Sequence, residues 1–113
     1  AIVCRINAEH PETFQPSPGL VADYHAPGGL GVRVDSALYA GYRVPPYYDS
    51  LIAKLIVHGK DRPAALARLA RALDEFVIEG VSTNLALHRR IIRSDDFIAN
   101  RIDVVWLERW LVA

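Results

Sequence analysis

Two consecutive prolines, Pro45 and Pro46, precede the most apolar run of the chain, Leu51 to Val57. Each proline fixes its own φ angle and lacks a backbone N–H donor, so the pair cannot lie inside a central β-strand. We therefore expect a rigid corner at the prolines and a strand over residues 51–58 that only Lys54 interrupts. Because a stiff corner loses little entropy on folding, it suits a surface that contacts another domain or a ligand. A plain structural turn covered by tyrosines is the alternative.

Residues 2–9 alternate between two faces, as the side chains of a β-strand do. Arg5, Asn7 and Glu9 share the polar face and follow one another at intervals of roughly 7 Å. On the residues alone, a solvated outer face is the simpler interpretation of this row. Arg5 is nevertheless the member best suited to bind a carboxylate or a bicarbonate-like anion, because its rigid guanidinium can donate two parallel hydrogen bonds.

The segment between the first strand and the proline corner is rich in proline and glycine. We expect an extended loop over residues 10–19, a short strand over 20–25, a tight hairpin turn over 26–31, a strand over 32–34 and a further short strand over 38–42. The glycines of the turn do not form a phosphate-binding loop, because no Gly-Lys-Ser/Thr follows them and the Gly-x-Gly-x-x-Gly spacing is absent.

After Gly59 the period of the apolar residues changes to steps of three and four. Asp61 is expected to cap the first of three helices, predicted over residues 62–76, 84–93 and 103–111. On the last of these, Trp106 and Trp110 lie one turn apart and form part of the core or of a docking patch.

The order of strands first and helices later predicts an α+β domain. We expect a small, mostly antiparallel sheet or half-barrel over residues 2–58, with the helices packed on it. The 113 residues, 51% of them hydrophobic, suffice for one domain with a buried core. Because the chain contains no methionine and opens inside an apparent strand, we expect a single-domain fragment of a longer protein.

Charge and cysteine content exclude several classes of function. Thirteen basic residues balance thirteen acidic ones, which argues against nucleic-acid binding. The single cysteine, Cys4, forms no internal disulfide and fits a reducing, cytoplasmic setting. No apolar run approaches the roughly 20 residues of a membrane span.

The residues alone assemble no catalytic set. Ser50 lies outside any Gly-x-Ser-x-Gly motif, and the four histidines have no metal-ligand spacing. Asp49 and Lys54 can form an ion pair, which is more often structural than catalytic. No carboxylate pair has the spacing of a magnesium site. We therefore expect neither a metal site nor nucleotide hydrolysis from these residues by themselves.

Five blocks of sequence occur in the order and spacing of one known family: Cys4–Glu9, Phe14–Gly19, Pro27–Gly29, Tyr42–Leu55 and Gly80–Asn84. Over residues 1 to about 97, the chain resembles the C-terminal domain of biotin carboxylase. The resemblance implies a place in a larger enzyme whose N-terminal and ATP-grasp domains are absent from this chain. That enzyme uses ATP, Mg²⁺ (or Mn²⁺) and bicarbonate to carboxylate biotin that is attached to a carrier protein.

The resemblance also implies roles for individual residues. Arg5 matches the arginine of the family's Cys-Arg-Ile-Asn-Ala-Glu motif, which contacts bicarbonate and biotin and stabilises the biotin enolate. Leu30 and Arg33 match residues of the homodimer interface, where Leu30 replaces a phenylalanine. A scaffold role behind the site is implied for four residues of the family's strongest motif: Tyr48, Asp49, Ser50 and Lys54.

The parent enzyme implied by the resemblance is the biotin carboxylase subunit of acetyl-CoA carboxylase, a cytoplasmic ligase of fatty-acid synthesis. Its partners are a second copy and the biotin carboxyl carrier protein. The equivalent domain of a propionyl-CoA, methylcrotonoyl-CoA or pyruvate carboxylase is an alternative, and so is a purely structural, dimerising module. We expect the isolated chain to bind no ATP, metal or biotin and to be inactive. The pair Trp106 and Trp110 has no counterpart in the resemblance.

Overall fold

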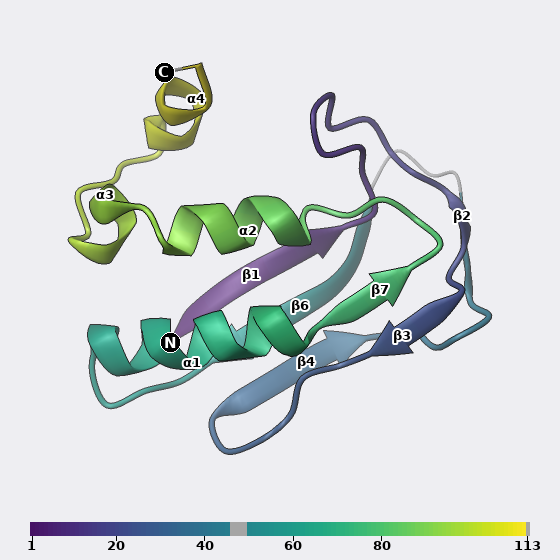
Figure 1. The fold of residues 1–113 in the computed structure, drawn as a ribbon, viewed down its shortest axis with the longest axis horizontal. Coiled ribbons are helices and arrows are strands. Elements are labelled where there is room, and N and C mark those ends of the chain that lie inside the picture. Colours follow the sequence, from purple (N-terminus) through teal and green to yellow (C-terminus); the bar gives the residue numbers. More distant parts are fainter. Residues whose placement is uncertain (46–49, 113) are drawn as a thin grey trace.

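The structure is a computed structural model that describes residues 1–45 and 50–112 (Figure 1). Its strands are β1 (Ile2–Asn7), β2 (Gly19–Leu20), β3 (Asp23–His25), β4 (Val32–Ser36), β5 (Arg43–Val44), β6 (Leu51–Val57) and β7 (Val77–Glu79). Its helices are α1 (Arg62–Glu75), α2 (Leu85–Ile92), α3 (Asp95–Ile98) and α4 (Trp106–Val112). The predicted α+β class is confirmed. The predicted corner falls mostly outside the described residues, because only Pro45 of its two prolines belongs to them.

The largest sheet of the described residues has the strand order β1-β6-β4, and both pairings are antiparallel. The central strand β6 is the predicted strand that follows the prolines. Ala53, Leu55 and Val57 are buried on one face of β6, whereas Lys54 is exposed on the other. Two smaller antiparallel sheets pair β2 with β5 and β3 with β7.

The helices cover one face of the main sheet. Helix α1 packs on β1 and β6, and α2 packs on α1 (Figure 1). The core lies between the sheet and these helices, and its largest fully buried side chains are Phe76, Ile6, Leu55, Leu69, Leu73, Val21 and Val57. Burial of a side chain of this size stabilises the fold by roughly 1.5–3 kcal/mol. Among the described residues, no helix covers the opposite face of the sheet, where Arg5, Arg33 and Lys54 are exposed; we call it the open face.

Helix α1 begins where its sequence predicts. The Asp61 side chain accepts a hydrogen bond from the backbone N–H of Ala64 at 2.9 Å, and Pro63 lies in the first turn. First-turn N–H groups have no partner inside a helix, so the cap stabilises the start and the proline causes no loss there. After α1 the chain continues directly into the short strand β7, which the period of the apolar residues did not predict.

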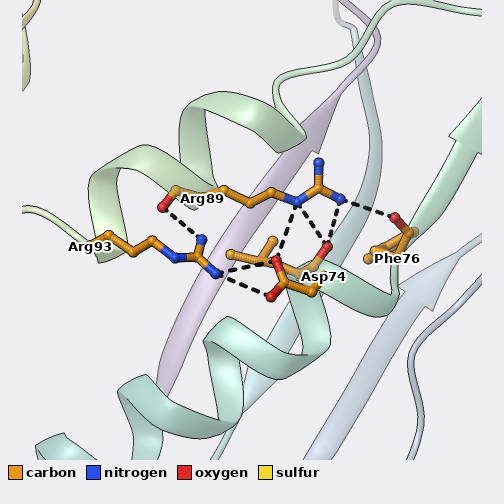
Figure 2. A network of polar contacts seen from close by, with 5 residues as sticks. Asp74, Phe76, Arg89 and Arg93 are labelled. Atoms are coloured by element: carbon orange, nitrogen blue, oxygen red, sulfur yellow. Dashed lines mark hydrogen bonds and ion pairs between the residues drawn. The ribbon is translucent and has the colours of Figure 1, made fainter.

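Helix α2 is fixed to the end of α1 by Arg89 (Figure 2). The Arg89 guanidinium donates two hydrogen bonds to the Leu73 carbonyl, at 3.1 and 2.7 Å, and one to the Phe76 carbonyl at 3.3 Å. Arg93 donates to both oxygens of Asp74, at 3.3 and 3.1 Å. The last carbonyls of a helix lack partners within it, and cationic side chains stabilise that end. Arg89 therefore joins two helices and satisfies buried carbonyls at the same time.

The predicted hairpin at residues 26–31 is wrong. A turn forms there, with Val32 N–H donating to the Gly29 carbonyl at 3.2 Å, but β3 and β4 do not pair with each other. Instead, β3 pairs with β7 and β4 pairs with β6. A local glycine pattern predicts the reversal of the chain but contains no information about which distant strand will offer a better partner.

Two other strand predictions need correction. The strand expected over residues 20–25 is divided into β2 and β3, which belong to different sheets. The strand expected over residues 38–42 is a turn instead, because Gly41 has a φ of +92° and Tyr42 N–H donates to the Tyr39 carbonyl at 3.0 Å. The chain becomes extended only afterwards, in β5.

The C-terminal part contains α3, which is not among the three predicted helices, and α4, which starts three residues after the predicted start at residue 103. Asp103 precedes α4, and its carbonyl accepts the N–H of Trp106 at 3.1 Å. Trp106 and Trp110 stack with their ring centroids 5.2 Å apart, and Trp106 is buried. The prediction that the two tryptophans share one face is confirmed.

In the described part of the chain, no helix combines the length and apolarity that a membrane crossing requires.

Candidate functional site

Arg5 lies on the open face of the main sheet. Its neighbours Cys4 and Ile6 are buried beneath the helices, whereas Arg5 itself is exposed, in keeping with the alternation of side chains along a strand. Among the described residues, the Arg5 guanidinium has no hydrogen-bond or ion-pair partner. The exposed Arg5 guanidinium is therefore available to bind a ligand.

The expected row of three polar side chains is only partly formed. The register between β1 and β6 shifts between Ile6 and Asn7, and β1 ends at Asn7. Glu9 is buried, with 9% of its surface exposed, and its carboxylate accepts from the Asn7 side chain at 3.4 Å. Arg5 is therefore separated from Glu9 by an irregularity of the strand, of the kind that redirects neighbouring side chains.

Lys54 is the cross-strand neighbour of Arg5, and Asp35 on β4 is the next residue in the same row. Residues that pair directly place their side chains on one face, with Cβ atoms about 4.5–5.5 Å apart. The Asp35 carboxylate is engaged by Arg33, whose Nε and Nη2 donate to it at 2.9 and 3.0 Å. Two positive charges thus lie side by side on the open face. Because like charges at opposite positions destabilise a sheet, this pair favours an anionic ligand.

Behind Arg5, two side chains from α2 and its N-terminal end contact the backbone of β1. Asn84 Nδ2 donates to the Arg5 carbonyl at 3.0 Å, and Asn84 Oδ1 accepts from the Asn7 N–H at 2.9 Å. His88 Nε2 lies 2.8 Å from the same Arg5 carbonyl. The sequence placed Asn84 at the start of a predicted helix and gave no sign of this contact. Its side chain makes no capping hydrogen bond to α2.

The protonation of His88 follows from its neighbours. A carbonyl only accepts, so His88 Nε2 carries the hydrogen that it donates to the Arg5 carbonyl. Burial lowers the pKa of His88 below its ordinary value, while the hydrogen bond to the Arg5 carbonyl and the charge of Glu9 act in the opposite direction. At neutral pH the imidazole is therefore uncharged and adds no third positive charge near Arg5.

The two residues assigned to a dimer interface are both exposed. Leu30, in the turn before β4, is 88% exposed. Arg33 lies on the same open face as Arg5, and the hydrogen bonds and charge of Asp35 raise the pKa of its guanidinium. Their role in an interface remains a prediction.

Of the four residues assigned to a scaffold, the structure describes Ser50 and Lys54. Tyr48 and Asp49 lie outside the described residues. The Ser50 carbonyl accepts from the Ala8 N–H at 2.8 Å, which joins the end of β1 to the start of β6. Lys54 lies beside Arg5 on the open face and not behind it. The scaffold role itself stays a prediction.

Within residues 1–45 and 50–112, no three His, Cys, Asp or Glu side chains are grouped so that they could hold a metal ion.

Comparison with known proteins decides the family. The sequence matches the family described as "Biotin carboxylase C-terminal domain" over residues 3–109. The chain belongs to this family. A biotin carboxylase of Allochromatium vinosum is 56% identical over 111 residues, which is 98% of this chain and 25% of that protein. One pyruvate carboxylase subunit, from Methanothermobacter thermautotrophicus, is 53% identical over 98 residues, which is 86% of this chain and 20% of that protein.

A solved structure shows the same fold. In the biotin carboxylase domain dimer of the Hydrogenobacter thermophilus 2-oxoglutarate carboxylase, determined with MgADP, ADP and bicarbonate, the matched part is 44% identical and has a TM-score of 0.91. The match covers 95% of this chain and 24% of that one. The predicted resemblance to the biotin carboxylase C-terminal domain is confirmed for both family and fold. This biotin carboxylase C-terminal domain spans about a quarter of the length of the curated biotin carboxylases that it matches.

Proposed function

We propose that this chain is one domain of a longer biotin carboxylase polypeptide and supplies Arg5 to its active site. The enzyme is an ATP-dependent ligase that carboxylates carrier-bound biotin with bicarbonate. The observation that carries the proposal is the setting of Arg5: an exposed guanidinium beside Lys54, on a strand whose backbone is held from behind. The bicarbonate bound in the related 2-oxoglutarate carboxylase domain supports an anion as the ligand.

The chemistry that the domain adds is electrostatic. The Arg5 guanidinium is always charged and presents its donors in a fixed plane, which matches two oxygens of bicarbonate or the oxygen of the biotin ureido group. A fixed donor aimed at the oxygen where negative charge develops lowers the barrier by roughly 3–4 kcal/mol. Arg5 therefore orients the anion and stabilises the charge that arises on it. Lys54 adds a second positive charge to the same face.

ATP and the metal ion are assigned to the other domains of the polypeptide. When bound, they activate bicarbonate for transfer. The described residues offer no carboxylate set for Mg²⁺ (or Mn²⁺), so no step of their chemistry is derived for this chain. We infer that this domain depends on its N-terminal and ATP-grasp neighbours for activity.

The pathway and the partners are part of the proposal. We favour the biotin carboxylase subunit of a cytoplasmic acetyl-CoA carboxylase, which acts in fatty-acid synthesis with a biotin carboxyl carrier protein. Relatives that are pyruvate and 2-oxoglutarate carboxylases make these the competing parents. A homodimer that uses Leu30 and Arg33 is supported by the exposure of both residues and by the dimer of the related structure.

A purely structural, dimerising module is the competing function, and the 88% exposure of Leu30 is the observation that favours it. Arg5→Ala in the full-length enzyme separates the two. We expect carboxylation of biotin to fall by roughly 10²–10³-fold, while folding and bicarbonate-dependent ATP cleavage persist. Arg101→Ala is the matched control, because Arg101 is an exposed arginine that pairs with Asp96 at 3.3 Å. Equal activities of the two variants would leave only the structural function.

A further inference from the structure

Arg5 lies on an outer strand, and the backbone of such a strand needs partners on its free side. Among the described residues the strand order is β1-β6-β4, so β1 pairs with β6 and with no other strand. The main-chain carbonyl of Arg5 and the N–H and carbonyl of Asn7 make their hydrogen bonds away from β6. Without partners these groups would be unsatisfied, and the edge would be free to move.

Asn84 supplies these partners in the way that a neighbouring strand would. Its carboxamide has the donor and acceptor geometry of a peptide group, and it accepts from Asn7 N–H at 2.9 Å while it donates to the Arg5 carbonyl at 3.0 Å. The backbone N–H of Asn84 donates to the Asn7 carbonyl at 3.3 Å. Asn84 is only 6% exposed, so water does not compete strongly for these bonds.

His88 adds a second donor to the same carbonyl. It lies four residues after Asn84 and therefore one helical turn along the same face. Its Nε2–H donates to the Arg5 carbonyl at 2.8 Å, so both lone pairs of that oxygen are engaged, one by each side chain. The carbonyl of the residue that bears the guanidinium is thereby fixed from two directions.

The support for this contact extends into the core. Arg89 follows His88 directly and ties α2 to the Leu73 and Phe76 carbonyls at the end of α1 (Figure 2). Helix α1 in turn packs on β1 and β6. Asn84 and His88 therefore project from a helix that is itself fixed to the sheet.

We propose that Asn84 and His88 are positioning residues for the carboxylation reaction, which hold the Arg5 backbone so that its guanidinium meets the reacting anion. The inference rests on the proposed function of Arg5. Fixing the main-chain carbonyl of Arg5 restricts the position of its Cα and therefore the positions that the guanidinium can reach. Displacement of a catalytic group by about 1 Å is sufficient to slow a reaction by about 100-fold. The irregularity between Ile6 and Asn7 makes this anchor more important, because β6 alone does not fix the strand there.

A double-mutant cycle in the full-length enzyme tests the inference. Asn84→Ala and His88→Ala are each made in the native enzyme and in the Arg5→Ala background, and biotin carboxylation is measured at saturating ATP and bicarbonate. In the native enzyme, each change is expected to lower kcat by roughly 10- to 100-fold. In the Arg5→Ala background the same change should have an effect of less than about twofold, because the group that was positioned is gone. His88→Gln, whose amide can still donate to the Arg5 carbonyl, should recover most of the His88→Ala loss.

Asp61→Ala is the matched control, since it removes one capping hydrogen bond of 2.9 Å at the other end of the framework. It should leave kcat unchanged in both backgrounds. Equal losses with and without Arg5, or no loss at all, would overturn the positioning role while the effect of Arg5→Ala alone stands. An Arg5→Ala enzyme with native kcat would instead overturn the proposed function itself. If Asn84→Ala does not fold, the two His88 variants decide the matter by themselves.

Discussion

Replacing Asn84 by alanine should loosen β1 at the position of Arg5 by an amount that follows from the structure. The change removes the acceptor of the Asn7 N–H and one of the two donors to the Arg5 carbonyl. An unsatisfied buried N–H costs about 1–3 kcal/mol, and the lost hydrogen bond to the carbonyl contributes about 0.5–1.5 kcal/mol. The Arg5 carbonyl retains His88 as a partner, so no further penalty arises there. The free energy of local opening should therefore fall by about 2–4 kcal/mol.

Native-state hydrogen exchange of the full-length enzyme measures this free energy directly, because it detects the opening of individual segments within a domain. A decrease of about 2–4 kcal/mol corresponds to exchange roughly 30- to 1000-fold faster in the peptide that contains β1. Asp61→Ala serves as the control and should accelerate exchange only at the start of α1. Unchanged exchange of the Asn7 amide in the Asn84→Ala enzyme would refute the conclusion that this side chain holds the strand.

Three further predictions concern other positions. Burial lowers the pKa of His88, so as pH falls below about 6.5 the unfolded chain takes up a proton before the folded one does. The protection factors of the β1 amides, which correct for the slower intrinsic exchange at lower pH, should therefore decrease between about pH 6.5 and 5 in the native enzyme but not in His88→Gln. A native protection factor that is independent of pH would contradict this. Burial raises the pKa of Cys4 to about 11, so iodoacetamide at about pH 8 should label it only after denaturation, and rapid labelling of the native enzyme would show that the thiol is accessible. Gly80 has a φ of +102°, and an added Cβ would collide with the Leu20 carbonyl, so Gly80→Ala should lower the free energy of unfolding, measured by urea titration, by more than about 1 kcal/mol. Gly41 also has a positive φ but faces open space, so Gly41→Ala should lower this free energy by less.

The sequence was sufficient wherever structure depends on local patterns. Strand β6 followed from an apolar run behind two prolines, and α1 followed from the period of its leucines and from the cap at Asp61. Strand pairing was not accessible in this way. The glycines at residues 28, 29 and 31 correctly indicated a turn, but the partners of the flanking strands lie far away in the chain.

The site was predictable only in part, for a similar reason. Arg5 could be chosen from the alternation of its strand and from the family motif, and its exposure agrees with both. Asn84 stands where a helix cap is expected, and nothing local distinguishes a cap from an asparagine that reaches a strand 77 residues earlier. The burial of a polar side chain immediately before a helix is the feature of the structure that reveals its different role.

A crystal structure of the complete enzyme with bicarbonate and biotin bound would test the central claim most directly. The quantity to measure is the distance from the Arg5 guanidinium nitrogens to the nearest oxygen of either substrate. We predict a contact of about 2.7–3.2 Å, with Asn84 and His88 still bonded to the Arg5 carbonyl. An Arg5 side chain that instead forms an ion pair with a protein carboxylate, away from both substrates, would contradict it.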